Sequence, residues 1–317
     1  MKIVITGASG FLGREVALSA IRRGHGVVAI GGSRRVPVVH RAVRTANVDL
    51  GVPQNLERLL LDEFPDAIVN CAALTTVEAC AAAPELAAKL NTDLPRFLAM
   101  MAQHFSARLI HVSTDEVFNG EQGNYAHTDT PTPAHLLGET KLAGEKEVLA
   151  HGKFHAVALR VPLISGNSVS GLHALHERLV ARWAQGEVTA LSPTQIRQPV
   201  DVSNLADAMV ELCERDNLSG VYHWAGTEAL SLHEIGRRVA AHFELTSDRF
   251  VTSAESDAVR VHDLSLDLHP LRGKLKTRAQ TFSEILSQMQ MPSQFADWHA
   301  AQIGRTAVRC FVRGVDF

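Results

Sequence analysis

The stretch that decides the fold is Lys2–Gly13, which reads KIVITGASGFLG. It joins a short apolar strand to a helix through a turn that contains Gly7, Gly10 and Gly13. Glycine accepts positive φ at such a turn, lets a pyrophosphate approach the backbone and allows the helix to pack closely on the strand. The N–H groups at the start of the helix then favour phosphate oxygens. The stretch therefore predicts a dinucleotide-binding loop with these contact residues: Gly7, Ser9, Gly10, Phe11, Leu12 and Gly13.

The alternative for this stretch is a plain turn between a strand and a helix, without a ligand. The rest of the first half alternates apolar runs with helical patterns. Strands are expected at 2–6, 25–30, 46–50, 67–71, 108–112 and 156–161, and helices at 11–23, 55–63, 84–104 and 136–150. Such alternation predicts a parallel sheet covered by helices on both faces, the Rossmann-type, doubly wound α/β fold. Ligands of these folds lie at the carboxyl ends of the strands, so the motifs below are expected to share one site.

The alternation breaks down after Pro162. We expect a nucleotide-binding domain over residues 1–165, with its sheet completed by about 199–225. A smaller, interleaved substrate lobe is expected from 166–198 and 226–291, with helices at 172–185 and 232–243. A further helix is expected at 204–214 and a strand at 220–224. The tail, residues 292–317, shows no clear period and has no functional interpretation.

Length, charge and composition are those of an ordinary globular protein. The 317 residues carry a net charge of -3, and the Lys and Arg residues are spread along the chain. This distribution argues against nucleic-acid binding, and no apolar run reaches the roughly 20 residues that a membrane helix needs. We therefore expect neither a nucleic acid nor a membrane as partner, and a cytoplasmic location.

The cysteines and histidines show no pattern typical of a metal site. Four cysteines, at positions 71, 80, 213 and 310, lie far apart without a CxxC pair. This argues against disulfides and zinc and for a reducing compartment. Two histidine pairs have helical spacing, His151 with His155 and His173 with His176, but neither has a carboxylate in a metal-binding pattern. We expect no metal site and interpret these histidines as surface residues.

The end of the second strand bears on the choice of cofactor. Residues 31–35 read GGSRR, without the acidic residue that usually holds the ribose hydroxyls of NAD. Arg34 and Arg35 suit the 2′-phosphate of NADP instead, because guanidinium groups pair with phosphate oxygens. NADP is therefore predicted over NAD, the alternative being two solvated arginines on a loop. Asp49, after the third strand, is expected either at the adenine edge or as the cap of the next helix.

Together these motifs resemble the extended short-chain dehydrogenase/reductases, and within them the dTDP-4-dehydrorhamnose reductases. The resemblance covers roughly residues 1–286, and residues 113–145 are its most specific part. The matching segments are Thr6–Gly13, Asp49-Leu50, Asn70–Ala73, Asn91, Ser113–Asp115, Val117-Phe118, Gly138 and Lys141–Glu145. The resemblance implies further cofactor contacts from Asp49, Leu50, Cys71, Ala72, Ala73 and Lys141.

A second resemblance is to the regulatory beta subunit of methionine adenosyltransferase, which belongs to the same group. The matching pieces are Gly220–Trp224, which reads GVYHW, and the pair Arg34-Arg35. This resemblance implies a protein that binds NADP and regulates a catalytic partner.

In the reductases a Thr or Ser, a Tyr and a Lys carry the reaction. The resemblance implies that the hydroxyl of Thr114 holds the substrate carbonyl, while Lys141 binds the nicotinamide ribose and lowers the pKa of the tyrosine. The tyrosine gives a proton to the oxygen as hydride reaches the carbon. It belongs four residues before Lys141, where this chain has Leu137.

Leu137 carries no proton, so a catalytic protein would need another acid, which typically contributes ~10²–10⁴ in rate. The candidates are Glu116, His135 and Glu139, of which Glu139 is expected to leave the site's face of the helix. Glu116 lies in the matching segment, and burial is expected to raise its pKa. The alternative for Glu116 is an ordinary loop carboxylate. Tyr125 matches a loop tyrosine of the family and is not a relocated catalyst.

Three functions are left open by the sequence. The first is an NADP-dependent oxidoreductase that acts on a nucleotide-sugar or similar ketone with an altered acid. The second is a catalytically inactive, NADP-binding regulatory subunit with a protein partner. The third is a redox-neutral dehydratase or epimerase. The first and third imply a small-molecule substrate, and a homodimer is left open as the assembly.

Overall fold

The main sheet of the protein is parallel throughout. The computed structural model describes residues 1–246, 249–252 and 261–304, and within them seven strands pair in the order β11-β6-β5-β4-β1-β2-β3. They are β1 (Lys2–Thr6), β2 (Gly26–Gly31), β3 (Val43–Asn47), β4 (Ala67–Asn70), β5 (Arg108–Thr114), β6 (Ala156–Val161) and β11 (Gly220–His223). The strand order reverses between β1 and β4, which confirms the Rossmann-type, doubly wound α/β fold.

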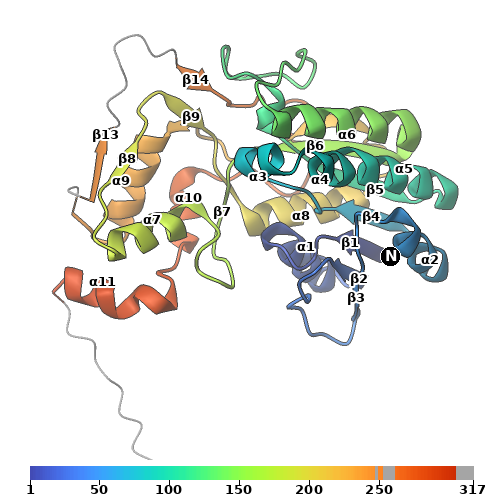
Figure 1. Cartoon of the computed structure of the whole chain (residues 1–317), viewed down its shortest axis with the longest axis horizontal. Coiled ribbons are helices and arrows are strands. Elements are labelled where there is room, and N and C mark those ends of the chain that lie inside the picture. The colour runs from blue at the N-terminus through green and yellow to red at the C-terminus, as the bar shows by residue number, and fades with distance from the viewer. Residues whose placement is uncertain (247–248, 253–260, 305–317) are drawn as a thin grey trace, which may run out of the picture.

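Helices cover both faces of this sheet (Figure 1). One face carries α1 (Phe11–Arg22) and α8 (Val202–Cys213), and the other α2 (Pro53–Glu63), α5 (Leu94–Phe105) and α6 (Leu136–Gly152). The central strands are apolar on both sides because both faces are buried. In β1, for example, Ile3, Val4 and Ile5 have no exposed surface.

The helix expected over 84–104 contains a wider turn. The chain runs through α3 (Val77–Ala82), α4 (Pro84–Ala88) and a π-helical segment Lys89–Asp93 into α5. Pro95 has no N–H to donate to the carbonyl of Asn91, which explains the missing helical hydrogen bond. This carbonyl faces Gly144 of α6, where a Cβ would lie 2.0 Å from the oxygen of Asn91. The wider turn therefore goes with a close approach of α6.

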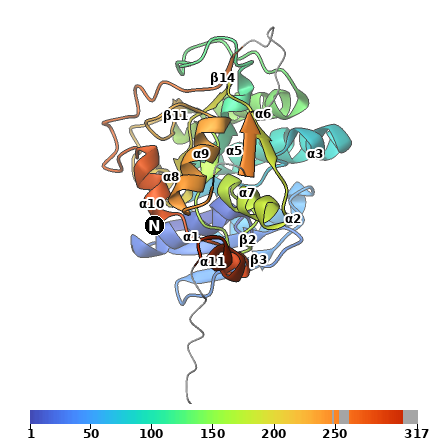
Figure 2. The same cartoon turned by 90° about the vertical axis from the view of Figure 1, so that its left-hand side faces the viewer.

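The second lobe combines short strands with helices and lies beside the sheet (Figures 1 and 2). Its strands are β7 (Ile164–Ser165), β8 (Thr189–Leu191), β9 (Gln195–Arg197), β10 (Val200–Asp201), β12 (Leu230–Ser231), β13 (Phe250–Thr252) and β14 (His262–Asp263). Its helices are α7 (Leu175–Ala184), α9 (Leu232–His242), α10 (Phe282–Gln288) and α11 (Ala296–Gln302). An apolar core of its own, around Trp183, Phe243 and Phe282, holds the lobe together.

The first part of the tail belongs to this lobe. A short 3-10 turn, Ser293–Phe295, leads into α11, and both Phe295 and Trp298 pack against the core of the lobe. The sequence showed no period here because the helix is short. Residues 305–317, with Cys310, lie outside the described residues.

The histidine pairs do not converge on a ligand. His173 is exposed, but His176 is buried against Phe243, so the expectation of a surface residue was wrong for His176. The reason is that α7 turns Leu179, Val180 and Trp183 toward the core of the lobe, and His176 shares this side. Among the described residues no group of three metal-ligating side chains forms, and no helix there could cross a membrane.

Candidate functional site

The glycine turn after β1 forms the first part of the site. Gly7 has a φ of +69°, and a Cβ there would lie 2.7 Å from the backbone nitrogen of Ala72. A Cβ on Gly13 would lie 2.3 Å from the carbonyl oxygen of Gly7. These two glycines are therefore required by the turn itself. At Gly10 the nearest atom would be 3.2 Å away, again the oxygen of Gly7, so the protein leaves room on the other side for a ligand.

The start of α1 is suited to an anion. Gly10 is its N-cap residue and no side chain caps the helix, so the first N–H groups are available to phosphate oxygens. Ser9 and Phe11 are half-buried beside them. Leu12 packs into the core under the sheet, so its contribution is limited to the backbone. The segment after β4, with Cys71 to Ala73, runs alongside because β1 and β4 are neighbours.

The end of β2 positions the two predicted arginines. Arg34 and Arg35 are exposed on a tight turn, where a Cβ on Gly31 would lie 2.5 Å from the carbonyl oxygen of Arg34. The side chain of Asn47, at the end of β3, donates hydrogen bonds of 2.8 Å to the carbonyls of Gly32 and Arg34. Sequence reasoning missed Asn47; its only signal was a polar residue at the carboxyl end of a strand.

Asp49 does not cap the following helix. Its carboxylate accepts a hydrogen bond of 3.0 Å from the N–H of Gly51, and α2 has Val52 at the N-cap without any side-chain cap. The helix-capping alternative for Asp49 was therefore wrong, because the chain makes a turn before the helix begins. Leu50 is buried in the core on this face of the sheet.

Thr114 and the residue that Lys141 contacts both lie near the carboxyl end of β5. Thr114 is the last residue of β5, and the ammonium of Lys141, from α6, donates a hydrogen bond to the carbonyl of Val112 in the same strand. Lys141 is only 4% exposed. Burial lowers the pKa of Lys141 to about 8, although the charge of Glu145 acts the other way.

Leu137 lies one turn before Lys141 and is buried. It packs with Cys80 of α3 and Ala87 of α4, and with the half-buried Leu74 and Leu136. The helices in front of α6 thus surround this position with apolar side chains. Among these side chains only the thiol of Cys80 carries a proton, and it donates to the carbonyl of Leu74 at 3.6 Å.

The acid candidates named from the sequence have other partners. The expectation that burial raises the pKa of Glu116 was wrong. Burial does act in that direction, but the charge of Arg197 and hydrogen bonds from Arg197 and His135 outweigh it and lower the pKa of Glu116. His135 caps α6, with Nδ1 accepting from the N–H of Gly138 at 3.3 Å and Nε2 2.8 Å from Glu116. Glu139 is exposed, on the far side of the helix as expected.

Tyr125 is held away from any catalytic role. Its ring stacks on Phe118 at a centroid distance of 4.1 Å, and its hydroxyl donates to the side-chain oxygen of Asn119 at 3.0 Å. Tyr125 is buried at 4% exposure. The phenol therefore serves the packing of this loop.

Besides Asn47, sequence reasoning missed two further site residues, Asp115 and Arg197. Asp115 is 2% exposed, and Arg197 of β9 donates to it at 3.0 Å and also to Glu116. Burial raises the pKa of Asp115 to about 6, and the charge of Arg197 offsets part of this effect. Arg197 comes from the second lobe, 82 residues along the chain, so no local pattern could have paired it with Asp115.

The GVYHW segment lies inside the molecule. Its strand, β11, pairs with β6 at the edge of the sheet, and both His223 and Trp224 are fully buried. Nδ1 of His223 lies 3.0 Å from the carbonyl oxygen of Asp267. Burial lowers the pKa of His223 to about 4. The similarity of this segment to a regulatory subunit therefore reflects the fold and not an exposed docking surface.

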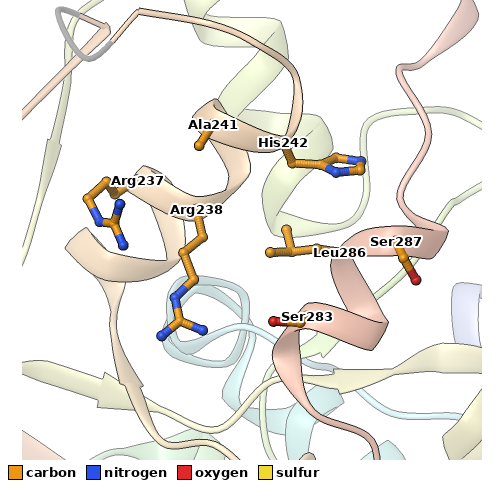
Figure 3. A pocket seen from close by; sticks show the side chains of 7 residues that line it. All are labelled: Arg237, Arg238, Ala241, His242, Ser283, Leu286 and Ser287. Atoms are coloured by element: carbon orange, nitrogen blue, oxygen red, sulfur yellow. The ribbon is translucent and has the colours of Figure 1, made fainter.

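A separate hollow of about 430 Å³ lies between α9 and α10 in the second lobe (Figure 3). It is lined by Arg237, Arg238, Ala241, His242, Ser283, Leu286 and Ser287. Its two arginines are engaged with Glu234, at 2.7 Å in each case. The hollow contains none of the motif residues, so it is not the candidate site.

The sheet order, the glycine turn at the switch point and the pair Thr114 and Lys141 together define an extended short-chain dehydrogenase/reductase. Within this class, the family described as the RmlD substrate binding domain matches residues 1–292, and the chain belongs to this family.

Three similar proteins illustrate the range of this family. Methionine adenosyltransferase 2 subunit beta of Xenopus laevis is 33% identical over 254 residues, which is 78% of this chain and 73% of the relative. A dTDP-4-dehydrorhamnose reductase of Mycobacterium tuberculosis (strain CDC 1551 / Oshkosh) is 32% identical over 235 residues, covering 73% and 71%. The crystal structure of a hypothetical dTDP-4-dehydrorhamnose reductase from Sulfolobus tokodaii has a TM-score of 0.76 at 28% identity, covering 89% and 97%.

Proposed function

We propose that the protein is an NADP(H)-dependent reductase of a nucleotide-sugar ketone, one that works without the family's tyrosine. The observation that carries this proposal is a buried Lys141 bonded to the carbonyl of Val112 in β5, the strand that ends at Thr114. Burying a lysine to 4% exposure costs folding free energy, and such lysines are typical of functional sites. The glycine turn for a dinucleotide is intact in the same chain.

The residues present fit a nicotinamide dinucleotide. The uncapped start of α1 and the open side of Gly10 suit the pyrophosphate, and Arg34 with Arg35 would hold a 2′-phosphate. When bound, the nicotinamide supplies a hydride to the carbonyl carbon. Lys141 would hold the ribose next to the ring, at the end of β5.

Thr114 would orient the substrate carbonyl. Its hydroxyl donates to Asp115 at 3.1 Å and accepts from the N–H of Glu116 at 3.2 Å. The second bond fixes the oxygen, because Thr114 is the N-cap of a short 3-10 turn, Asp115–Val117, and accepts from the N–H of Glu116 within it. A substrate oxygen near Thr114 would therefore meet a hydroxyl whose position is set before binding.

The replacement of tyrosine by Leu137 determines the expected rate. A positioned general acid contributes ~10²–10⁴, so hydride transfer without one is slow. We therefore expect a low turnover on the native substrate, or a different route for the proton.

A second candidate function is that of a non-catalytic, NADP-binding regulatory subunit. The observation in its favour is the apolar packing of Leu137 against Cys80 and Ala87, which leaves no acid at the family's position. The similarity to methionine adenosyltransferase 2 subunit beta points the same way. Under this proposal the dinucleotide stabilises a fold that a catalytic partner recognises.

NADPH turnover by wild type and Leu137→Tyr on one panel of nucleotide-sugar ketones separates the two candidates. If hydride transfer is intact, the new phenol lies one turn from Lys141 and raises turnover, by up to ~10²–10⁴ where the acid is all that is missing. Leu136→Tyr is the matched control, because it adds a phenol to the same apolar cluster in the wrong register.

Measurable turnover by wild type, with a gain for Leu137→Tyr and none for Leu136→Tyr, supports the reductase. No turnover by any of the three proteins, with NADPH bound by all of them, contradicts the reductase and favours the regulatory subunit.

A further inference from the structure

Two adjacent carboxylates at the end of β5 share one guanidinium. Arg197 donates to Asp115 at 3.0 Å and to Glu116 with its other nitrogen. His135 caps α6 through Nδ1 and lies 2.8 Å from Glu116 through Nε2. With both acids ionised, the trio of Asp115, Glu116 and Arg197 holds one excess negative charge. Asp115, at 2% exposure, is more deeply buried than Glu116. A proton that neutralises this excess charge therefore binds more favourably to Asp115 than to Glu116.

The two oxygens of Asp115 have different partners. Oδ2 accepts from Arg197, whereas Oδ1 accepts from the hydroxyl of Thr114 at 3.1 Å. A proton on Oδ1 would thus leave the bond to Arg197 in place and point at the oxygen of Thr114. The hydroxyl of Thr114 would then turn its own hydrogen toward the substrate.

We propose that Asp115 supplies the proton that tyrosine supplies elsewhere in the family, and passes it through Thr114 to the substrate oxygen. This inference rests on the reductase function proposed above. Asp115 does not touch the substrate in this scheme, so it acts through Thr114, the residue in contact.

The step balances as follows. A bound NADPH would supply a hydride to the carbonyl carbon, and the electron pair of the C=O π bond would move to oxygen. That oxygen takes the proton of the Thr114 hydroxyl, while the oxygen of Thr114 takes the proton of Asp115. The products are the alcohol, NADP⁺, an unchanged Thr114 and an ionised Asp115, which is reprotonated from solvent.

The groups around Asp115 raise or lower its pKa. Burial raises the pKa of Asp115 to about 6, with Arg197 lowering it and Glu116 raising it. His135 lies on Glu116 at 2.8 Å, and His262 of β14, the strand beside β9, responds to the charges of Arg197 and Glu116. Protonation of either histidine would add positive charge and oppose protonation of Asp115, so the assignment needs variants and not only a pH profile.

The first test is a ¹³C-carboxyl NMR titration of the whole protein without cofactor or substrate. Aspartate-labelled wild type should show one resonance with a midpoint near pH 6, missing in Asp115→Asn. Glu116→Gln should move this midpoint to lower pH, because a charge that raises the pKa of Asp115 is removed. A midpoint for Asp115 near the ordinary aspartate value in wild type would overturn the proposal.

The second test is the pH dependence of NADPH turnover. Wild-type turnover should rise about tenfold for each pH unit lowered above pH 6 and level off below it, since the protonated acid is the active form. Asp115→Asn should lose about 10²–10⁴ in turnover together with this pH dependence, while NADPH still binds. Thr114→Ser should keep most of the activity and Thr114→Val should not, because only serine retains the hydroxyl.

Glu116→Gln best distinguishes a proton donor at Asp115 from one at Glu116. The proposal predicts that this variant remains active and that its pH dependence moves to lower pH. Abolished turnover in Glu116→Gln, or an unchanged pH profile in Asp115→Asn, would overturn the relay and leave the reductase intact. No turnover by wild type on the whole panel would overturn the proposed function and the relay with it.

Discussion

The cofactor end and the proton-donor end of the candidate site differ in what they are made of. At the cofactor end the turn after β1 depends on the backbone, with Gly7 and Gly13 so close to other main-chain atoms that no side chain fits. At the proton-donor end the family's chemistry depends on one phenol, and here Leu137 takes its place. A substitution at these glycines damages the turn itself, whereas replacing the phenol by Leu137 removes the acid and leaves the fold in place.

The two ends also differ in the side chains that surround them. Around Leu137 the helices α3 and α4 supply apolar contacts, which would leave a polar side chain at this position without partners. Just after β5, Asp115 forms a buried polar pair with Arg197 of the second lobe. Asp115 and Glu116 thus lie just after β5, bonded to Arg197 of β9 and to His135 at the N-cap of α6, whereas the surroundings of Leu137 are apolar.

The largest effect is expected from Gly10→Val. Its side chain would occupy the side of Gly10 that the protein leaves open, and so displace a pyrophosphate from the N–H groups of α1. Each lost hydrogen bond to a charged group costs about 1.5–3 kcal/mol, so the Kd for NADPH should rise at least roughly 100-fold while the protein stays folded. Isothermal titration calorimetry with a circular dichroism check measures both.

Two variants serve as controls for this result. Gly26→Val lies at the start of β2, where a Cβ would meet only the carbonyl oxygen of Met1 at 3.9 Å, and should leave binding unchanged. Gly13→Val should damage the fold itself, because its Cβ would lie 2.3 Å from the oxygen of Gly7. Unchanged NADPH affinity in a folded Gly10→Val protein would show that the turn has no ligand.

A smaller and more selective effect is expected from replacing both Arg34 and Arg35 by alanine. The double variant should lose roughly 10- to 100-fold in affinity for NADPH and little for NADH, because only NADPH carries the 2′-phosphate. Arg41→Ala removes an exposed arginine from the same connection and should change neither affinity. Equal losses for the two cofactors in the double variant would remove these arginines from a 2′-phosphate site.

The sequence was sufficient to predict the fold because the pattern was local and repeated. Apolar strands alternate with helices throughout the first half, and the glycine turn falls between the first of each, so the parallel sheet followed. Thr114 and Lys141 were identified through the family resemblance; the structure places Thr114 at the end of β5 and Lys141 on α6, bonded to the same strand.

The proton-donor end could not be predicted in the same way. Sequence reasoning named Glu116, His135 and Glu139 as acid candidates and did not consider Asp115, whose contact with Arg197 spans 82 residues. Likewise, Asn47 was missed because its role is to hold a turn that lies across from it in space. Charge balance in a buried cluster is a property of tertiary contacts, which a linear pattern does not contain.

The most direct test of the account is the transfer of label from the cofactor to a product. Wild-type protein is incubated with stereospecifically 4-deuterated NADPH, one C4 epimer at a time, and a panel of nucleotide-sugar ketones that includes dTDP-4-dehydrorhamnose. The products are analysed by mass spectrometry, which detects even a single slow turnover. The account predicts an alcohol that carries one deuterium from one of the two epimers. Bound NADPH with no deuterated product from either epimer would contradict it.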